Sequence, residues 1–122
     1  VYEGERKTKR LDPEIYKIIG VTPKAISLSK EDIVDRCILP MINEASRCLE
    51  EGIVRTPEDV DLGMIMGTGF PPFRGGLLRY ADSVGVRKIV TKLKNLEPLQ
   101  GARYRPDASL IARANRDAKF YT

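Results

Sequence analysis

One ten-residue stretch gathers residue types that often line a ligand site. Residues 67–76 read GTGFPPFRGG, with four glycines, two prolines, two phenylalanines and one arginine. A glycine-rich turn binds phosphate when its amide hydrogens converge on the anion. Here position 72, where a dinucleotide fingerprint needs its third glycine, is proline, and leucines follow the last two glycines where a P-loop needs lysine. These departures argue against a phosphate cradle.

We interpret the stretch instead as a packed connector between two helices. Gly67 and Gly69 permit a positive φ where the first helix ends. The glycine pair at 75–76 allows a close backbone approach where the next helix begins. We expect Phe70 and Phe73 to be pressed into the gap between helices.

Few side chains in this chain can carry chemistry. There is no histidine, which closes Ser-His-Asp and Cys-His mechanisms and most zinc sites. Arg74 is the residue of the connector that can hold a phosphate or carboxylate, and an ion pair with a local acid is the alternative. We therefore predict no catalytic, cofactor-binding or metal-ligating residue in this chain.

The two cysteines are expected to be free thiols. Cys37 and Cys48 lie on one predicted helix, roughly 16 Å apart at about 1.5 Å per residue. A disulfide needs Cα atoms within about 7 Å, so these two cysteines are too far apart to form one. Free thiols suit a reducing cytoplasm. We favour two small core residues over a reactive thiol.

Composition indicates one soluble globular domain. The chain has 122 residues, of which 42% are hydrophobic and 31% charged, and no apolar run approaches a membrane span of roughly 20 residues. The first ten residues are charged, unlike a signal peptide, and the first is not Met. We interpret the chain as a piece of a longer protein.

The mild net charge of +4 leaves a second function class open. Basic residues cluster near both ends of the chain, at Arg6, Lys7, Lys9 and Arg10 and again at Arg103, Arg105, Arg113, Arg116 and Lys119. Such clusters can follow the phosphates of a nucleic acid, although solvated surface is the more common explanation. A small basic helical nucleic-acid-binding domain is therefore the alternative function.

The longest predicted helix spans SKEDIVDRCILPMINEASRCLEEG. Ser29 is a good N-cap with Asp32 three positions on, and Gly52 is a natural stop. Apolar residues recur at three- and four-residue steps on one face. Pro40 interrupts this pattern, at a usual cost of about 3 kcal/mol inside a helix. We predict one long helix kinked near Pro40, with two broken helices as the competing interpretation.

The remaining pattern is helical throughout, and no convincing strand is found. Residues 1–28 form an arm with a short helix capped by Asp12, and residues 29–122 form the domain. Helices are predicted from Thr56 to Gly67, before Gly85, from Val86 to Pro98 and Gly101, and after an Asp107 cap. The short link near residue 52 predicts that the second helix packs on the long one as an antiparallel hairpin.

Residues 32–85 resemble the C-terminal domain of 3-hydroxyacyl-CoA dehydrogenases. The motif GFPPFRGG together with NEA and EGI carries the resemblance, which covers roughly residues 29–95. It is most similar to the second of two such domains in the α-subunit of the bacterial fatty acid oxidation complex. The resemblance implies an all-α bundle of five to six helices, like the C-terminal domain of 6-phosphogluconate dehydrogenase.

The resemblance also implies where the chemistry lies in a parent enzyme. That parent has an enoyl-CoA hydratase/isomerase part, an NAD-binding Rossmann domain with the catalytic His-Glu pair, and two related helical domains. The family's active-site asparagine lies in a V-N-R motif, and Asp35 replaces it here in Val34-Asp35-Arg36. This chain would thus have kept the fold and lost the chemistry.

Five residues remain interdomain or substrate-cleft candidates: Asn43, Glu44, Phe70, Phe73 and Arg74. We favour polar links between helices or domains for Asn43 and Glu44 over contact with substrate. The expected partners are the first helical domain and the Rossmann domain of a cytoplasmic parent, with acyl-CoA contacted indirectly and NAD bound elsewhere. In isolation the fragment is expected to be inactive and to self-associate, whereas turnover by the isolated chain would indicate an autonomous enzyme.

Overall fold

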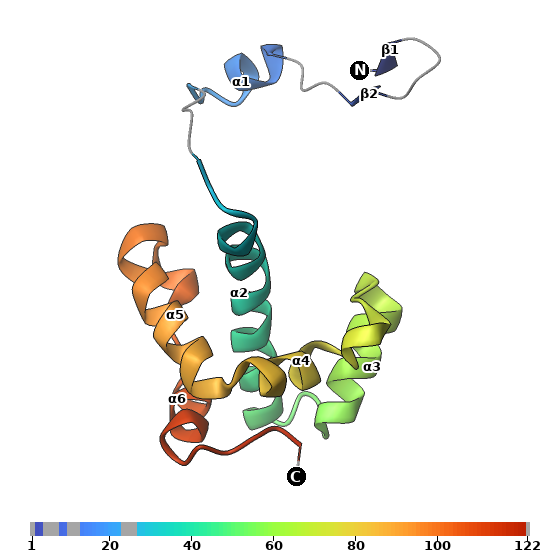
Figure 1. The fold of residues 1–122 in the computed structure, drawn as a ribbon, viewed down its shortest axis with the longest axis vertical. Helices are drawn as coiled ribbons and strands as arrows, with labels where there is room; N and C mark the ends of the chain where they lie inside the picture. The colour runs from blue at the N-terminus through green and yellow to red at the C-terminus, as the bar shows by residue number, and fades with distance from the viewer. Residues whose placement is uncertain (1, 4–7, 10–12, 23–26, 122) are drawn as a thin grey trace.

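The computed structural model describes residues 2–3, 8–9, 13–22 and 27–121 (Figure 1). Within them lie six α-helices and two short 3₁₀ turns, which confirm the all-α fold. The helices are α1 (Glu14–Ile18), α2 (Lys30–Glu50), α3 (Pro57–Thr68), α4 (Leu77–Val84), α5 (Val86–Gln100) and α6 (Ala108–Asn115), and the turns are η1 (Pro72–Arg74) and η2 (Ala102–Tyr104).

The arm contains a two-residue antiparallel ladder that the sequence pattern did not predict. Strand β1 (Tyr2–Glu3) pairs with β2 (Thr8–Lys9), with Tyr2 opposite Lys9. Helix α1 begins one residue later than expected, because Pro13 is its N-cap residue, while Asp12 lies outside the described residues. Among the described helices, none is long and apolar enough to cross a membrane.

Helix α2 is continuous from Lys30 to Glu50, so the prediction of one long helix is confirmed and two broken helices are excluded. A complete capping box starts it: the Asp32 amide donates to Ser29 Oγ at 3.0 Å, and the Ser29 amide donates to Asp32 Oδ2 at 3.1 Å. Buried residues on both sides of Pro40 hold the helix against the core, which offsets the amide that proline lacks. The predicted kink stays a prediction.

The core lies between α2, α4, α5 and α6 (Figure 1). Helix α5 packs along α6 and η2, and α4 bridges from α3 back to α2 and α5. The largest fully buried side chains are aliphatic and come from these four helices: Ile42, Leu77, Leu78, Ile89, Leu93 and Leu110. Their burial at about 25 cal/mol per Å² supplies the main driving force for the fold.

Helix α3 is placed differently from the prediction. It runs back antiparallel to α2 as predicted, but it diverges from α2 and its main packing partner is α4, so the expected close packing of these two helices is wrong (Figure 1). A groove of about 530 Å³, called here the α2–α3 groove, lies between the two helices. Its lining is mostly apolar: Pro40, Met41, Glu44, Ala45, Cys48, Val54, Asp59, Val60, Gly63 and Met64.

Helix α3 extends beyond its predicted stop, whereas α5 ends where Gly101 predicted it to end. Helix α3 continues through Gly67 to Thr68, and Gly69 ends it in the left-handed region at φ 72°. Helix α5 includes Pro98 in its last turn and ends at Gly101. A proline removes only its own amide, so the turn that contains it can still be completed by neighbouring bonds.

Candidate functional site

Asp61 is a buried acid at the centre of the glycine-rich connector. Its side chain comes from α3 and is 4% exposed. Asp61 Oδ1 accepts from the Leu78 amide at 2.6 Å, and Oδ2 accepts from the Arg79 amide at 3.1 Å and from Tyr121 Oη at 2.6 Å. The carboxylate therefore satisfies the free amides at the start of α4, where negative charge is favoured.

Gly76 is required for this contact. A Cβ at position 76 would lie 2.3 Å from both Cβ and Cγ of Asp61, and the residue adopts φ 114°. The connector thus closes on a carboxylate of its own chain, which accepts from the amides of Leu78 and Arg79. The stretch joins α3 to α4, as predicted for a connector between two helices.

The two phenylalanines of the connector have opposite environments. Phe70 is 7% exposed and stacks near Tyr80, with ring centroids 6.3 Å apart, as predicted for a residue between helices. Phe73 is 82% exposed, so its predicted burial is wrong. It sits in the tight η1 turn after two prolines, and this turn directs it outward.

Arg74 packs against aromatic rings. Its guanidinium carbon lies 5.7 Å from the Phe73 ring centroid and 5.8 Å from that of Tyr80. Cation–π contact of this kind is worth about 0.5–1 kcal/mol at an exposed site. Within the described residues this stacking takes the place of the ion pair we expected as the alternative to ligand binding.

Asp82, together with Asp61, fastens the C-terminal segment. Asp82 Oδ1 accepts from the Phe120 amide at 2.8 Å and Oδ2 from the Tyr121 amide at 2.9 Å. The Arg79 guanidinium lies over the Tyr121 ring at 3.9 Å. Burial and the bond to Asp61 raise the pKa of the Tyr121 phenol well above its usual range. The sequence analysis did not predict these contacts of Asp61 and Asp82 with the C-terminal segment. The position of Asp61 next to the apolar Val60 was an available signal that its carboxylate is buried.

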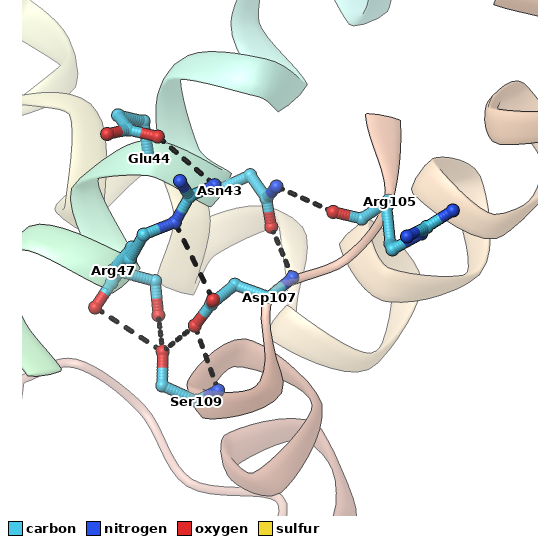
Figure 2. Close-up of polar contacts among 7 residues, drawn as sticks. Asn43, Glu44, Arg47, Arg105, Asp107 and Ser109 are labelled. Atoms are coloured by element: carbon cyan, nitrogen blue, oxygen red, sulfur yellow. Dashed lines mark hydrogen bonds and ion pairs between the residues drawn. The ribbon is translucent and has the colours of Figure 1, made fainter. Parts of the chain in front are cut away.

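Asn43 lies at the centre of a second polar cluster (Figure 2). It is 2% exposed, its Nδ2 donates to the Arg105 carbonyl at 2.8 Å, and its Oδ1 accepts from the Asp107 amide at 2.7 Å. Asn43 thus ties α2 to the segment entering α6, which makes it a link between helices. Its possible roles between domains or toward substrate stay predictions.

Asp107 and Glu44 complete the cluster drawn in Figure 2. Burial pushes the pKa of Asp107 up, but hydrogen bonds from Ser109 and the nearby Arg47 charge outweigh it and hold the pKa below its ordinary value. Arg47 Nε lies 3.7 Å from Asp107 Oδ2, and its Nη2 lies 3.3 Å from Glu44 Oε2. Glu44 is therefore an exposed partner of Arg47 at the edge of the α2–α3 groove.

Asp35 is engaged in an ion-pair triad. Lys92 Nζ donates to Asp35 Oδ2 at 2.6 Å and to Glu31 Oε1 at 3.0 Å. The bond that Lys92 donates to Asp35 raises the pKa of the Lys92 ammonium. A pocket of about 450 Å³ between α2, α4 and α5 includes this triad in its lining. The acid at this position is therefore bound to a lysine of its own domain.

The free thiols and the basic C-terminus also have definite places. Both cysteines are unpaired as predicted, but Cys37 is exposed, so its expected core position is wrong, whereas Cys48 is half-buried in the α2–α3 groove. Arg105 pairs with Glu97 at 2.7 Å, and Arg113 donates to the Lys119 carbonyl at 2.6 Å. These local contacts give no support to a phosphate-binding stripe.

Comparison with known proteins identifies the class of domain. Residues 33–119 match the family described as 3-hydroxyacyl-CoA dehydrogenase, C-terminal domain. Solved structures with the same fold include FadB2 of M. tuberculosis (TM-score 0.65, 24% identity, 88% of this chain and 39% of that one). Another is the (S)-3-hydroxybutyryl-CoA dehydrogenase PaaH1 of Ralstonia eutropha (TM-score 0.63, 30% identity, 84% and 35%).

The chain belongs to this family of helical dehydrogenase C-terminal domains. Curated relatives are fatty acid oxidation complex α-subunits: that of Vibrio parahaemolyticus is 46% identical over 120 residues, and that of Vibrio vulnificus is 44% identical. Each alignment takes in 98% of this chain and 17% of the relative, so the chain spans about a sixth of their length.

Proposed function

We propose that this chain is a non-catalytic packing domain of a longer, NAD-dependent 3-hydroxyacyl-CoA dehydrogenase in fatty acid β-oxidation. In that enzyme the reaction would oxidise the 3-hydroxyl of an acyl-CoA to a ketone, with NAD held by a separate Rossmann domain. The domain would pack on the first helical domain and support the acyl-CoA cleft. The similarity to α-subunits of the fatty acid oxidation complex supports this parent.

The non-catalytic assignment rests on the hydrogen bonds and ion pairs that the polar candidate residues make within their own domain. Asn43 uses both ends of its buried amide on the backbone of its own domain. Asp35, which stands where the family resemblance places an asparagine, is paired with Lys92 at 2.6 Å. Groups committed to such bonds cannot also orient a substrate without breaking them, at a cost of about 1–3 kcal/mol each.

An exposed apolar face on α3 supports the packing role. Leu62 and Met66 are 62% and 78% exposed and lie one helical turn apart, and Phe73 is exposed on the neighbouring η1 turn. Helices that are apolar on more than one side are normally buried on more than one side. We assign the three exposed side chains Leu62, Met66 and Phe73 to the contact with the first helical domain.

Two activity measurements test the proposal. The isolated chain should show no NADH oxidation with acetoacetyl-CoA, and the parent carrying Asp35→Ala should keep kcat within about twofold, since a general acid or base contributes roughly 10²–10⁴-fold. The parent carrying Leu62→Asp and Met66→Asp should lose activity with the domain still folded by circular dichroism. Turnover by the isolated chain, or a hundredfold loss in Asp35→Ala, contradicts a non-catalytic domain.

A further inference from the structure

The pocket that includes the Lys92 triad in its lining, called here the lysine pocket, lies between α2, α4 and α5 (Figure 1). Its volume of about 450 Å³ falls within the range of about 300–1,000 Å³ that is typical of small-molecule sites. Leu39 and Ile89, which are 3% and 0% exposed, are its most deeply buried lining residues. The other apolar and aromatic residues of the lining are partly or largely exposed: Val34, Ile38, Tyr80 and Val84. An apolar molecule in this pocket would therefore cover side chains that otherwise meet water.

Five charged residues complete the lining, and helical spacing explains why the lysines gather there. Lys30 lies one turn before Val34 on α2, and Lys88 lies one turn before Lys92 on α5. Residues four positions apart share a helix face, so each pair points to the same side of its helix. The remaining two charged residues of the lining are acids: Glu31 and Asp35. Three lysines against two acids leave one positive charge in excess.

Both acids of the pocket are engaged by a single lysine. Lys92 Nζ donates to Asp35 Oδ2 at 2.6 Å and to Glu31 Oε1 at 3.0 Å. In the part of the chain that the structure describes, the ammonium groups of Lys30 and Lys88 have no hydrogen-bond or ion-pair partner. Both lysines are exposed. Their charges are therefore available to an anion that enters the pocket.

The α2–α3 groove provides an internal comparison. It is also mostly apolar, with a volume of about 530 Å³, but the two charged residues that line it, Glu44 and Asp59, are both acids. The two cavities therefore offer apolar surface with charges of opposite sign. An anionic molecule with an apolar body should enter the lysine pocket and avoid the groove, because opposite charges attract and like charges repel.

We propose that the lysine pocket binds a small anionic amphiphile, that is, a molecule with an aliphatic body and one carboxylate or phosphate head. The aliphatic body lies against Leu39, Ile89 and Val34, where it gains from burial. The head interacts with Lys30 and Lys88, whose charges strengthen the hydrogen bonds that they donate. This inference goes beyond the proposed function, which assigns a packing role to the domain and no ligand of its own.

Titration of the full chain with octanoate, followed by methyl NMR, is the direct test. We expect the methyl signals of Val34 and Val84 to shift and saturate, whereas those of Val54 and Val60, which line the α2–α3 groove, should stay in place. The neutral analogue 1-octanol should bind about two- to fivefold more weakly, as expected for the loss of an exposed charge pair. Octyl phosphate should shift the same signals, and the tighter of the two anions identifies the preferred head.

A pair of charge reversals on α5 tests the role of the lysines. Lys88→Glu should raise the dissociation constant of octanoate about tenfold, because it replaces attraction by repulsion. The matched control Lys94→Glu makes the same change at an exposed residue of the same helix outside the pocket, and should raise it less than about twofold, since distant exposed charges are screened. An unchanged methyl signal of Leu110 in the core shows that each variant is folded.

Three results would overturn the proposal. The first is the absence of a saturable shift at Val34 and Val84 in the folded chain. The second is a shift at Val54 and Val60 as large as theirs, or equal binding of octanoate and 1-octanol, since either would mean that any apolar surface suffices. The third is equal weakening of octanoate binding by Lys88→Glu and Lys94→Glu, which would assign the effect to the overall charge of the chain.

Discussion

Two sides of α3 differ in the polarity and the exposure of their side chains. The side facing α4 presents Asp61, a buried charge with three hydrogen-bond donors around it. Another side of α3 presents Leu62 and Met66, apolar side chains that are mostly exposed. In an isolated soluble domain the reverse is the usual arrangement. The α4 side is therefore satisfied within this chain, and under the proposed function the exposed side contacts the first helical domain.

The largest expected effect on the free energy of unfolding is on the side of α3 that faces α4. Gly76→Ala should lower the free energy of unfolding by about 4 kcal/mol, because the new Cβ overlaps Asp61 at a positive φ. The matched control is Gly67→Ala, where a new methyl group would meet no atom within 4 Å and the backbone is helical. That change should stabilise by up to about 1 kcal/mol. Urea unfolding of both variants checks this, and equal effects would show that the connector does not close on Asp61.

Removal of Asp61 itself should lower the free energy of unfolding by somewhat less than Gly76→Ala does. Asp61→Ala leaves two amides and one phenol without their acceptor, so we expect a loss of about 3 kcal/mol. Tyr121→Phe removes one of these bonds and should cost about 1 kcal/mol. In a double-mutant cycle the two losses should not add, because both variants delete the same contact. Full additivity would mean that Tyr121 does not bind Asp61 in solution.

Asn43 and Glu44 provide a comparison of neighbours on α2. Asn43→Ala should destabilise by about 2 kcal/mol, since it leaves a buried carbonyl and amide unpaired. Glu44→Ala should change stability by no more than about 0.5 kcal/mol, because its ion pair with Arg47 is exposed. Chemical denaturation of both variants is the measurement. A large effect at Glu44 alone would reverse the roles that the structure gives them.

The smallest expected effect depends on pH. The pKa of Asp107 is held below its ordinary value of 3.8 in the folded chain, so the unfolded chain binds a proton more readily. Stability from this group is therefore present above pH 3.8 and is lost as pH falls below it. Asp107→Asn should be less stable at neutral pH and should show a shallower decline in acid. Thermal unfolding at a series of pH values is the measurement. If Asp107→Asn leaves the loss of stability in acid unchanged, that loss belongs to other carboxylates.

Local signals predicted much of the fold from the sequence. The Ser29, Thr56 and Asp107 caps all accept the backbone bonds expected of them, because capping depends on neighbours within three residues. The packing of α3 on α4 rather than on α2 could not be predicted in the same way. Its apolar residues surround the helix, so periodicity did not indicate which side would pack on α4.

The candidate site was only partly accessible to sequence reasoning. The glycine-rich stretch was correctly predicted to join two helices, because its glycines and prolines are visible in the sequence itself. The exposure of Phe73 and the hydrogen bond from the Leu78 amide to Asp61 depend on contacts between residues far apart in the chain. Such contacts are set by tertiary packing, which a single sequence does not display.

Hydrogen–deuterium exchange of the parent enzyme and the isolated chain tests the central claim most directly. If the open side of α3 packs on the first helical domain, amides of Pro57–Thr68 should exchange more slowly in the parent than in the isolated chain. Amides of α6 (Ala108–Asn115), whose contacts lie within this domain, should exchange at similar rates in both. Equal exchange of α3 in the two proteins, with new protection confined to other helices, would contradict the account.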